Sequence, residues 1–328
     1  MRKALLALLV IGLAAIGVFY FVTAPVRVPQ SALRAHTPDL ANGKYIFAAG
    51  GCAECHAAPF QGCSDLKIKV DERLTGGRCL KTPFGTFNVP NISPDKESGI
   101  GNWTTLDFVN AMKRGIAPDG SYLYPAFPYP SYQRMTYEDV MDLKAYLDSL
   151  PVVKNKVPPS EIRFPFNFRR GLGLWHLLYV DGQSFTPDPS ASAEINRGAY
   201  LVRGAGHCSE CHSARNVFGG IIKDTEFAGA RNLEGKGRVP NITPSEDGIG
   251  DWSEEDIAYM LETGNTPDFD TIGETMAPVQ KNMAKLTPAD RKAIAAYIKS
   301  LPPRPDAVPK SKESGDAEGS VTSGENKQ

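Results

Sequence analysis

The stretch GGCAECHAAP (residues 50–59) places two cysteines and a histidine within five positions, and GHCSECHSAR (206–215) repeats the arrangement. Three longer segments recur in the same order: NGKYIFAAGGCAECH (42–56) with NRGAYLVRGAGHCSECH (196–212), VPNISPDKESGIGNWT (89–104) with VPNITPSEDGIGDWS (239–253), and MTYEDVMDLKAYLDSLP (135–151) with LTPADRKAIAAYIKSLP (286–302). The shared order indicates two tandem copies of one domain.

Each copy has apolar residues at helical spacing, and we find no alternating strand pattern of useful length. The last element of each copy begins at Thr136 or Thr287, with an aspartate three residues later as in a helix N-terminus. We therefore predict an all-α fold with one domain over 36–151 and a second over 191–303, joined by a linker over 152–190.

The linker and the C-terminal segment differ in composition. The middle of the linker, FRRGLGLWHLLYV (168–180), is apolar enough to predict a buried helix between the domains. Residues 304–328 are polar and charged, with almost no large apolar side chains, so we expect a flexible tail there.

The N-terminal segment is apolar and uncharged over residues 4–22, directly after Arg2 and Lys3. This length is close to what a helix needs to cross the hydrocarbon layer of a membrane. A proline follows the best cleavage position, after Ala24, which favours an uncleaved transmembrane anchor over 1–25 rather than a cleaved signal peptide. Both interpretations export the rest of the chain, with the two basic residues on the cytoplasmic side.

Charge excludes one class of function. Lys and Arg total 36 and Asp and Glu total 37, so the net charge is close to zero. A protein that binds nucleic acid through its backbone phosphates needs a basic surface, so we expect no nucleic-acid partner.

The pattern C-x-x-C-H is the attachment signature of c-type haem. Two cysteines three residues apart on a helical turn point to one side, where they form thioethers with the vinyl groups of a single porphyrin, and the histidine binds the iron. A zinc site would need further thiol or imidazole ligands in each copy, and the chain has only 5 histidines. A redox-active dithiol would not need the histidine. We therefore predict two covalently bound haem c groups, held by Cys52, Cys55 and His56 and by Cys208, Cys211 and His212.

The sequence indicates the second axial ligand of each iron less directly. The histidines outside the motifs do not lie at matching positions in the two copies: His36, His176 and His207. Methionine is the usual alternative in cytochromes c. Met135 is the candidate in the first copy, and Met276 is preferred over Met283 in the second, because Met283 lies only a turn before the last helix. Other internal methionines lie within helical patterns, where packing explains them: Met112, Met141 and Met260.

The segments NVPNISPDKESGIGNWT, YLYPAFPYPSYQRMT and AYLDSLP resemble the multi-haem cytochrome c subunits of bacterial membrane-bound alcohol, gluconate and aldehyde dehydrogenases. The resemblance covers about residues 40–302 and implies two class I cytochrome c domains with His/Met ligation on the periplasmic side of the inner membrane. It also implies a catalytic dehydrogenase subunit of flavin, quinone or molybdenum type as electron donor, and quinone, an oxidase or another cytochrome as acceptor. Members that serve alcohol dehydrogenases carry three haem motifs, whereas this chain has two. Some members have methionine where this chain has Phe127.

The function expected from these features is single-electron transfer by a membrane-anchored dihaem cytochrome, with no catalytic residue. The alternative is a haem enzyme, such as a dihaem peroxidase or a thiosulfate-oxidising cytochrome, in which one iron has a labile axial site.

Cys63 and Cys79 are not needed for haem attachment. In an oxidising compartment a disulfide between them is expected, and two free thiols are the alternative.

Overall fold

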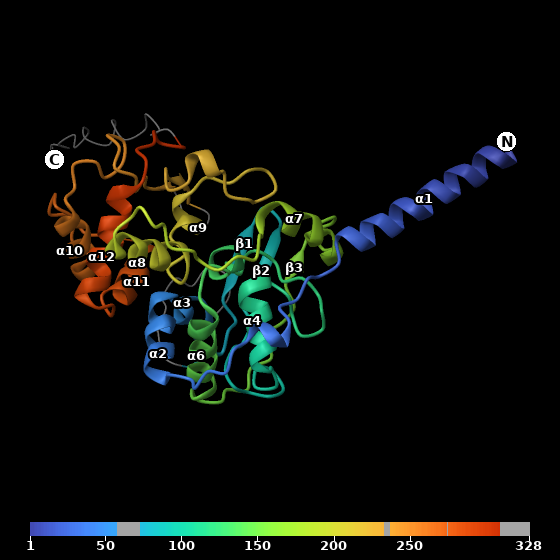
Figure 1. Ribbon diagram of the computed structural model, residues 1–328, viewed down its shortest axis with the longest axis horizontal. Coiled ribbons are helices and arrows are strands. Elements are labelled where there is room, and N and C mark those ends of the chain that lie inside the picture. The colour runs from blue at the N-terminus through green and yellow to red at the C-terminus, as the bar shows by residue number, and fades with distance from the viewer. Residues whose placement is uncertain (58–72, 233–236, 274, 309–328) are drawn as a thin grey trace, which may run out of the picture.

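The computed structural model describes residues 1–57, 73–232, 237–273 and 275–308, and the described chain is mainly helical (Figure 1). The helix α1 (Arg2–Val22) precedes both copies of the domain. The first copy, here called the first repeat, has the helices α2 (Leu40–Ala49), α3 (Cys52–His56), α4 (Thr105–Arg114), α5 (Tyr129–Tyr132) and α6 (Tyr137–Asp148). The linker carries α7 (Leu172–Tyr179), and the second repeat has α8 (Ala193–Arg203), α9 (Ser209–His212), α10 (Glu254–Thr263), α11 (Met276–Met283) and α12 (Pro288–Ser300). The short 3-10 turns are η1 (Gln30–Ala32), η2 (Arg169–Gly171) and η3 (Lys223–Thr225).

Short strands supplement the helices. In the first repeat β1 (Cys79–Thr82) and β2 (Gly85–Asn88) form an antiparallel hairpin with Cys79 opposite Asn88, and β3 (Glu161–Ile162) of the linker pairs antiparallel with β2. In the second repeat β4 (Ala230–Arg231) pairs with β5 (Arg238–Val239). None is longer than four residues, which is too short for periodicity in the sequence to reveal.

The first and last helices of each repeat cross at a glycine. A Cβ atom at Gly43 of α2 would lie 2.2 Å from the carbonyl oxygen of Asp142 in α6. A Cβ atom at Gly198 of α8 would lie 1.8 Å from the carbonyl oxygen of Ala293 in α12. Any larger residue would push the two backbones apart, so these glycines fix how closely the helices that frame each repeat can pack.

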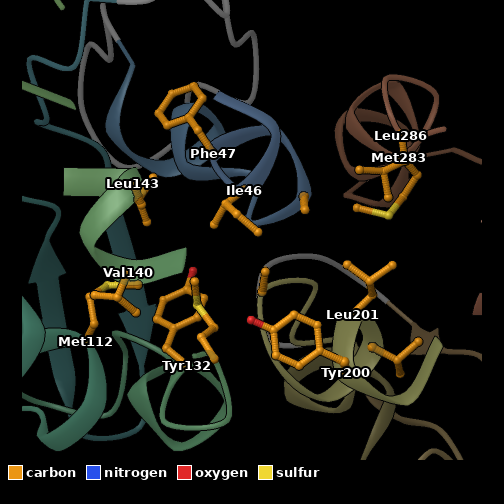
Figure 2. Packing of buried hydrophobic residues seen from close by; sticks show 14 of the residues in the cluster. Ile46, Phe47, Met112, Tyr132, Val140, Leu143, Tyr200, Leu201, Met283 and Leu286 are labelled. Atoms are coloured by element: carbon orange, nitrogen blue, oxygen red, sulfur yellow. The ribbon is translucent and has the colours of Figure 1, made fainter. Parts of the chain in front are cut away.

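Apolar side chains from both repeats form one continuous buried cluster (Figure 2). The first repeat contributes Ile46, Val140 and Leu143, and the second contributes Leu201 and Leu286. Because the core is shared, the two repeats are packed against each other rather than tethered by a free linker.

The predicted helix starts at Thr136 and Thr287 are confirmed. The hydroxyl of each threonine accepts a hydrogen bond from the backbone N–H of the aspartate three residues later, Asp139 or Asp290, at 3.1 Å. In a simple capping box the aspartate side chain would return to the threonine N–H of its own helix. Here a tyrosine from the other repeat stands between those two groups.

The backbone N–H of Thr136 donates to the hydroxyl of Tyr200 over 3.0 Å, and Tyr200 donates to the carboxylate of Asp139. In the opposite direction, the N–H of Thr287 donates to the hydroxyl of Tyr45 over 3.2 Å, and Tyr45 donates to Asp290. Tyr45 and Tyr200 are at corresponding places in α2 and α8, in the shared pattern Gly-x-Tyr. We call this pair of contacts the tyrosine relays; each repeat uses one to complete the helix cap of the other.

The linker and the tail differ from expectation. The predicted linker helix is present as α7, but its prediction as a buried helix between the domains was wrong, because Leu174, Leu177 and Leu178 are 46%, 63% and 70% exposed. The start of the expected flexible tail is fixed, since the N–H of Ala307 donates to the carbonyl of Ala228 over 2.9 Å. The tail from residue 309 onward lies outside the described residues.

The tyrosine relays predict a matched pair of stability losses. Tyr45→Phe and Tyr200→Phe each remove the hydroxyl that joins a helix-cap N–H to a carboxylate, buried Asp290 or half-buried Asp139, so each is expected to lower the free energy of unfolding by about 1–2 kcal/mol. Chemical denaturation of the haem-loaded chain measures this. Tyr259→Phe is the control, because Tyr259 is 52% exposed on α10. The relays would be refuted as interface contacts if neither variant lost more stability than this control.

Candidate haem sites

Each C-x-x-C-H motif follows the first helix of its repeat after a short connection. In the first repeat α2 ends at Ala49 with Gly50 as its C-cap, and the single helical turn α3 brings Cys52 and Cys55 to one side before His56. In the second repeat, α9 ends at His212 in the same way. The sulfur atoms of Cys52 and Cys208 belong to half-buried free thiols. This is the arrangement that attachment to a single porphyrin needs.

Both motif histidines are oriented by a backbone carbonyl. Nδ1 of His56 lies 2.8 Å from the oxygen of Pro90, and Nδ1 of His212 lies 2.8 Å from the oxygen of Pro240. A carbonyl oxygen can only accept, so Nδ1 carries the proton in both rings and Nε2 keeps its lone pair. Such a bond fixes the tautomer and the ring direction of a metal-binding histidine. The geometry therefore fits axial ligation of iron through Nε2.

Burial keeps these imidazoles neutral. Burial lowers the pKa of His56 to about 4, although its hydrogen bond to Pro90 opposes the shift. Burial also lowers the pKa of His212. Burial also raises the pKa of the thiols of Cys52 and Cys208 to about 12, with the neighbouring motif cysteine adding to the effect. At neutral pH these two imidazoles and two thiols are therefore uncharged, which suits a porphyrin.

The turn that supplies each proline carbonyl is held by the next residue. Asn91 accepts from the N–H of Ser93 over 2.8 Å and donates to the carbonyl of Val153 over 2.8 Å. Asn241 accepts from the N–H of Thr243 over 2.8 Å and donates to the carbonyl of Arg304 over 2.8 Å. The recurring V-P-N triplet therefore has a reason: its proline orients the histidine, and its asparagine holds the turn.

An apolar cavity adjoins the second motif. Its lining consists of carbon-rich side chains and one motif cysteine: Ala49, Leu201, Val202, Gly206, Cys208, Met283, Leu286 and Ile294. Within the described ranges, no group of three or more His, Cys, Asp or Glu side chains is placed to hold a bare metal ion. Two thiols, one imidazole and an apolar wall are the donor set and surroundings of a covalently attached haem.

The candidate axial methionines occupy different surroundings. Met135 is fully buried just before α6, and its carbonyl accepts a hydrogen bond from the ammonium group of Lys113. Met276 is half-buried and begins α11. Met283 ends α11, is 5% exposed and lines the cavity beside Cys208.

The remaining histidines have other contacts. Nε2 of His36 lies 2.6 Å from Oδ1 of Asp142, and the ring of His176 stacks on Tyr129 with the ring centres 5.3 Å apart. His207, next to Cys208, has its Nε2 atom 3.3 Å from the carbonyl oxygen of Gly50 in the first repeat.

The two motifs meet at the interface between the repeats. Oε1 of Glu210 in the second motif accepts a hydrogen bond from the hydroxyl of Ser131 over 2.8 Å. Glu54 in the first motif accepts from the side-chain amide of Asn282. When the repeats are aligned on their final helices, Ser131 and Asn282 correspond, so these bonds form a second reciprocal pair beside the tyrosine relays.

Cys79, at the start of β1, is disulfide-bonded. Cys63, its expected partner, lies outside the described residues.

Comparison with known proteins agrees with this geometry. The cytochrome c family model matches residues 40–151 and again residues 195–302. A protein described as "Diheme cytochrome c-type" from Cereibacter sphaeroides is 45% identical over 302 residues, covering 92% of this chain and 99% of that protein. The chain therefore belongs to the cytochrome c family and has two tandem cytochrome c domains, each carrying one covalently bound haem c.

Relatives that are subunits of larger enzymes are similar over most of this chain. The fructose dehydrogenase cytochrome subunit of Gluconobacter japonicus is 36% identical over 83% of this chain, and the cytochrome c subunit of the quinone-type alcohol dehydrogenase of Gluconacetobacter polyoxogenes is 38% identical over 83%. The aligned part of this chain spans 54% and 58% of those proteins. The resemblance to dehydrogenase cytochrome subunits, the fold class and the two haem c groups are thus confirmed.

The asparagine side chains that hold these turns are predicted to contribute to the stability of the fold. Asn241→Ala removes the side chain that joins Thr243 to Arg304 at a position only 2% exposed, so the free energy of unfolding should fall by about 2–3 kcal/mol. Thermal unfolding followed by haem absorbance checks this. The control is Asn102→Ala, since Asn102 is exposed and makes one bond, to the carbonyl of Lys96 at 2.7 Å. Equal losses in the two variants would contradict the role given to Asn241.

Proposed function

We propose that this chain carries electrons, one at a time, from a membrane-associated dehydrogenase to the respiratory chain through two haems, one held by each repeat. The observation that carries the proposal is the reciprocal interface, which brings the two C-x-x-C-H motifs together. Haem iron with both axial positions filled supplies reversible one-electron oxidation and reduction without bond chemistry. Cytochrome subunits of fructose and alcohol dehydrogenases among the relatives support a dehydrogenase as the donor.

The motif residues are proposed to hold the haems. Cys52 and Cys55 would form the thioethers of the first haem, and His56 would bind its iron. Cys208, Cys211 and His212 take the same roles in the second repeat. The support is the common geometry of the two motifs, with Nδ1 of each histidine bonded to a proline carbonyl and Nε2 left for iron.

Met276 is proposed as the distal ligand of the second haem. Met283 corresponds to Tyr132 when the repeats are aligned on their final helices, and both are buried core residues. Met283 lines the cavity next to Cys208, and the thiols of Cys52 and Cys55 raise the pKa of Tyr132 after the larger effect of burial. Because a tyrosine and a methionine take the same place, that position serves packing. Met276, outside this shared wall, is left for ligation.

Met135 is proposed as the distal ligand of the first haem. It is the methionine of the first repeat that precedes the last helix rather than lying within a helix, as Met112 and Met141 do. It corresponds to Leu286, so the two repeats would present their distal ligands from differently shaped segments.

A direct route joins the two motifs. His207 directly precedes Cys208 in the chain, and its ring lies close to the carbonyl oxygen of Gly50. Gly50 in turn lies two residues before Cys52. The path from one motif to the other therefore needs only one non-covalent step, within the interface that the tyrosine relays hold closed. We propose that electrons pass between the haems here rather than through solvent.

We propose that α1 anchors the chain in the bacterial inner membrane with both repeats on the periplasmic side. The helix is 21 residues long, has no buried residue, and passes the length and hydropathy criteria for a membrane span. The chain that follows is fixed to the first repeat, because the N–H of Val28 donates to the side chain of Asn110 over 2.8 Å.

The ligand assignment predicts two separable spectral changes. Met276→Leu and Met135→Leu should each convert one iron from low to high spin and lower its reduction potential, since methionine ligation raises that potential. Electron paramagnetic resonance and redox titration measure both effects. The volume-matched controls Met283→Leu and Met141→Leu should leave the spin state unchanged. If Met283→Leu gave the high-spin signal instead, the assignment in the second repeat would be wrong. A high-spin iron already present before mutation of Met135 would favour the haem enzyme.

The electron-transfer role predicts coupling to a dehydrogenase in native membranes. Alcohols, aldehydes, sugars and sugar acids are added separately, and haem reduction and oxygen uptake are followed. At least one substrate class should reduce both haems, and deletion of this chain should abolish the oxygen uptake that the substrate drives. Haems that dithionite reduces but that none of these substrates reduces, or rapid turnover of peroxide by the purified chain, would overturn the proposal.

A further inference from the structure

Helix α7 exposes an apolar face where a surface helix ordinarily carries polar residues. Leu174, Leu177 and Leu178 have the spacing of one helix face and are 46%, 63% and 70% exposed. Between Leu172 and Tyr179 the sequence contains no Asp, Glu, Lys or Arg. An exposed apolar face of this kind marks an interaction surface rather than solvent contact.

The opposite face of α7 is fixed to the protein by specific contacts. The ring of His176 stacks on Tyr129, and the indole N–H of Trp175 donates to the carbonyl of Phe218 over 3.0 Å. The hydroxyl of Tyr179 accepts from the side-chain amide of Asn216 over 2.9 Å. The leucines are therefore held outward by the packing of the other side of the helix, not by a loosely attached segment.

Segments next to α7 also carry exposed aromatic side chains. Three further aromatic side chains around α7 are strongly exposed: Phe164 at 85%, Phe168 at 51% and Phe218 at 63%. We call these three residues and the three exposed leucines of α7 the apolar patch.

The patch adjoins the point at which α1 leaves the folded body (Figure 1). The ring of Phe168 stacks on that of Phe19 in the last turn of α1, with centres 6.0 Å apart and planes at 19°. Nε of Arg170 donates to the hydroxyl of Thr23 over 2.9 Å. Gly173 of α7 packs so closely on Thr23 that an added Cβ would lie 2.5 Å from the threonine Cβ.

These contacts set the level of α7 relative to a membrane that α1 crosses. The apolar run ends at Val22, so Thr23 lies where the chain emerges from the hydrocarbon layer. Helix α7 begins against Thr23 and is thus at the same depth. Arg163, Arg169 and Arg170 precede it and supply positive charge, which suits lipid phosphates.

We infer that α7 and the apolar patch lie in the outer surface of the lipid bilayer, as a second membrane contact beside α1. The occupant of this surface is lipid, because the patch is continuous with the residues that leave the bilayer. This inference rests on the proposed anchoring by α1. Its consequence is orientation: a single helix lets the body tilt and rotate, whereas α1 and α7 together hold the haem domains in one pose above the membrane.

Labelling by lipid tests the contact in the full haem-loaded chain. The protein is placed in lipid nanodiscs that contain phosphatidylglycerol and a phospholipid with a photoreactive acyl chain, and cross-linked peptides are located by mass spectrometry. Peptides from α1 and from residues 164–180 should both be labelled. The triple variant L174Q/L177Q/L178Q should lose labelling of 164–180 at least fivefold, with the label on α1 and the haem spectrum unchanged. An unchanged spectrum shows that the variant has folded.

The matched control removes exposed apolar side chains far along the chain from α7. Tyr259 and Phe269 are 52% and 98% exposed in the second repeat, and Y259Q/F269Q should leave all labelling as in the unchanged chain. Label on α1 without label on 164–180 overturns this inference and leaves the anchor in place, as it would if a protein partner covered the patch. Label on 164–180 alone refutes the anchor, and with it the paired contact, and leaves α7 as the contact with lipid. Label on neither refutes both.

Discussion

An imidazole has two ring nitrogens, and in each motif of this chain one of them is committed to a backbone carbonyl. The bonds from Nδ1 of His56 to Pro90 and of His212 to Pro240 determine the tautomer, the ring direction and the free position at Nε2. The turns held by Asn91 and Asn241 exist to present those carbonyls. The helices that precede the motifs are packed closely on the last helix of each repeat at Gly43 and Gly198.

Because the domain is duplicated, each repeat contributes contacts that complete the other repeat. Each repeat needs a partner for the N–H of the threonine that caps its last helix, and the other repeat supplies it through Tyr45 or Tyr200. The glutamates of the two motifs also bond across the interface: Glu210 accepts from Ser131, and Glu54 accepts from Asn282. Reciprocal contacts of this kind fix both the distance and the rotation between the repeats. Both C-x-x-C-H motifs are thereby held at one interface, which is the arrangement that the proposed electron exchange between two haems requires.

Much of this could be predicted from the sequence, because the decisive features are local. The motifs, the helix starts at Thr136 and Thr287 and the repeat depend on residues close together in the chain. The tyrosine relays could not be predicted, since the pattern of threonine and aspartate is that of a closed capping box and gives no sign of a third group 61 residues from Asp139. The role of the proline carbonyls was missed because a backbone acceptor leaves no mark in residue type. The burial of α7 was predicted wrongly because an apolar composition does not say whether protein or lipid covers it.

Two haems attached covalently at the two motifs are the central claim, and the mass of the denatured chain tests it most directly. After extraction with acid and acetone, which removes haem that is not covalently bound, the intact chain should retain the mass of two haems. Digestion should locate one on the peptide with Cys52 and Cys55 and one on the peptide with Cys208 and Cys211. A chain that loses its colour, or that retains fewer than two haems, would contradict the account.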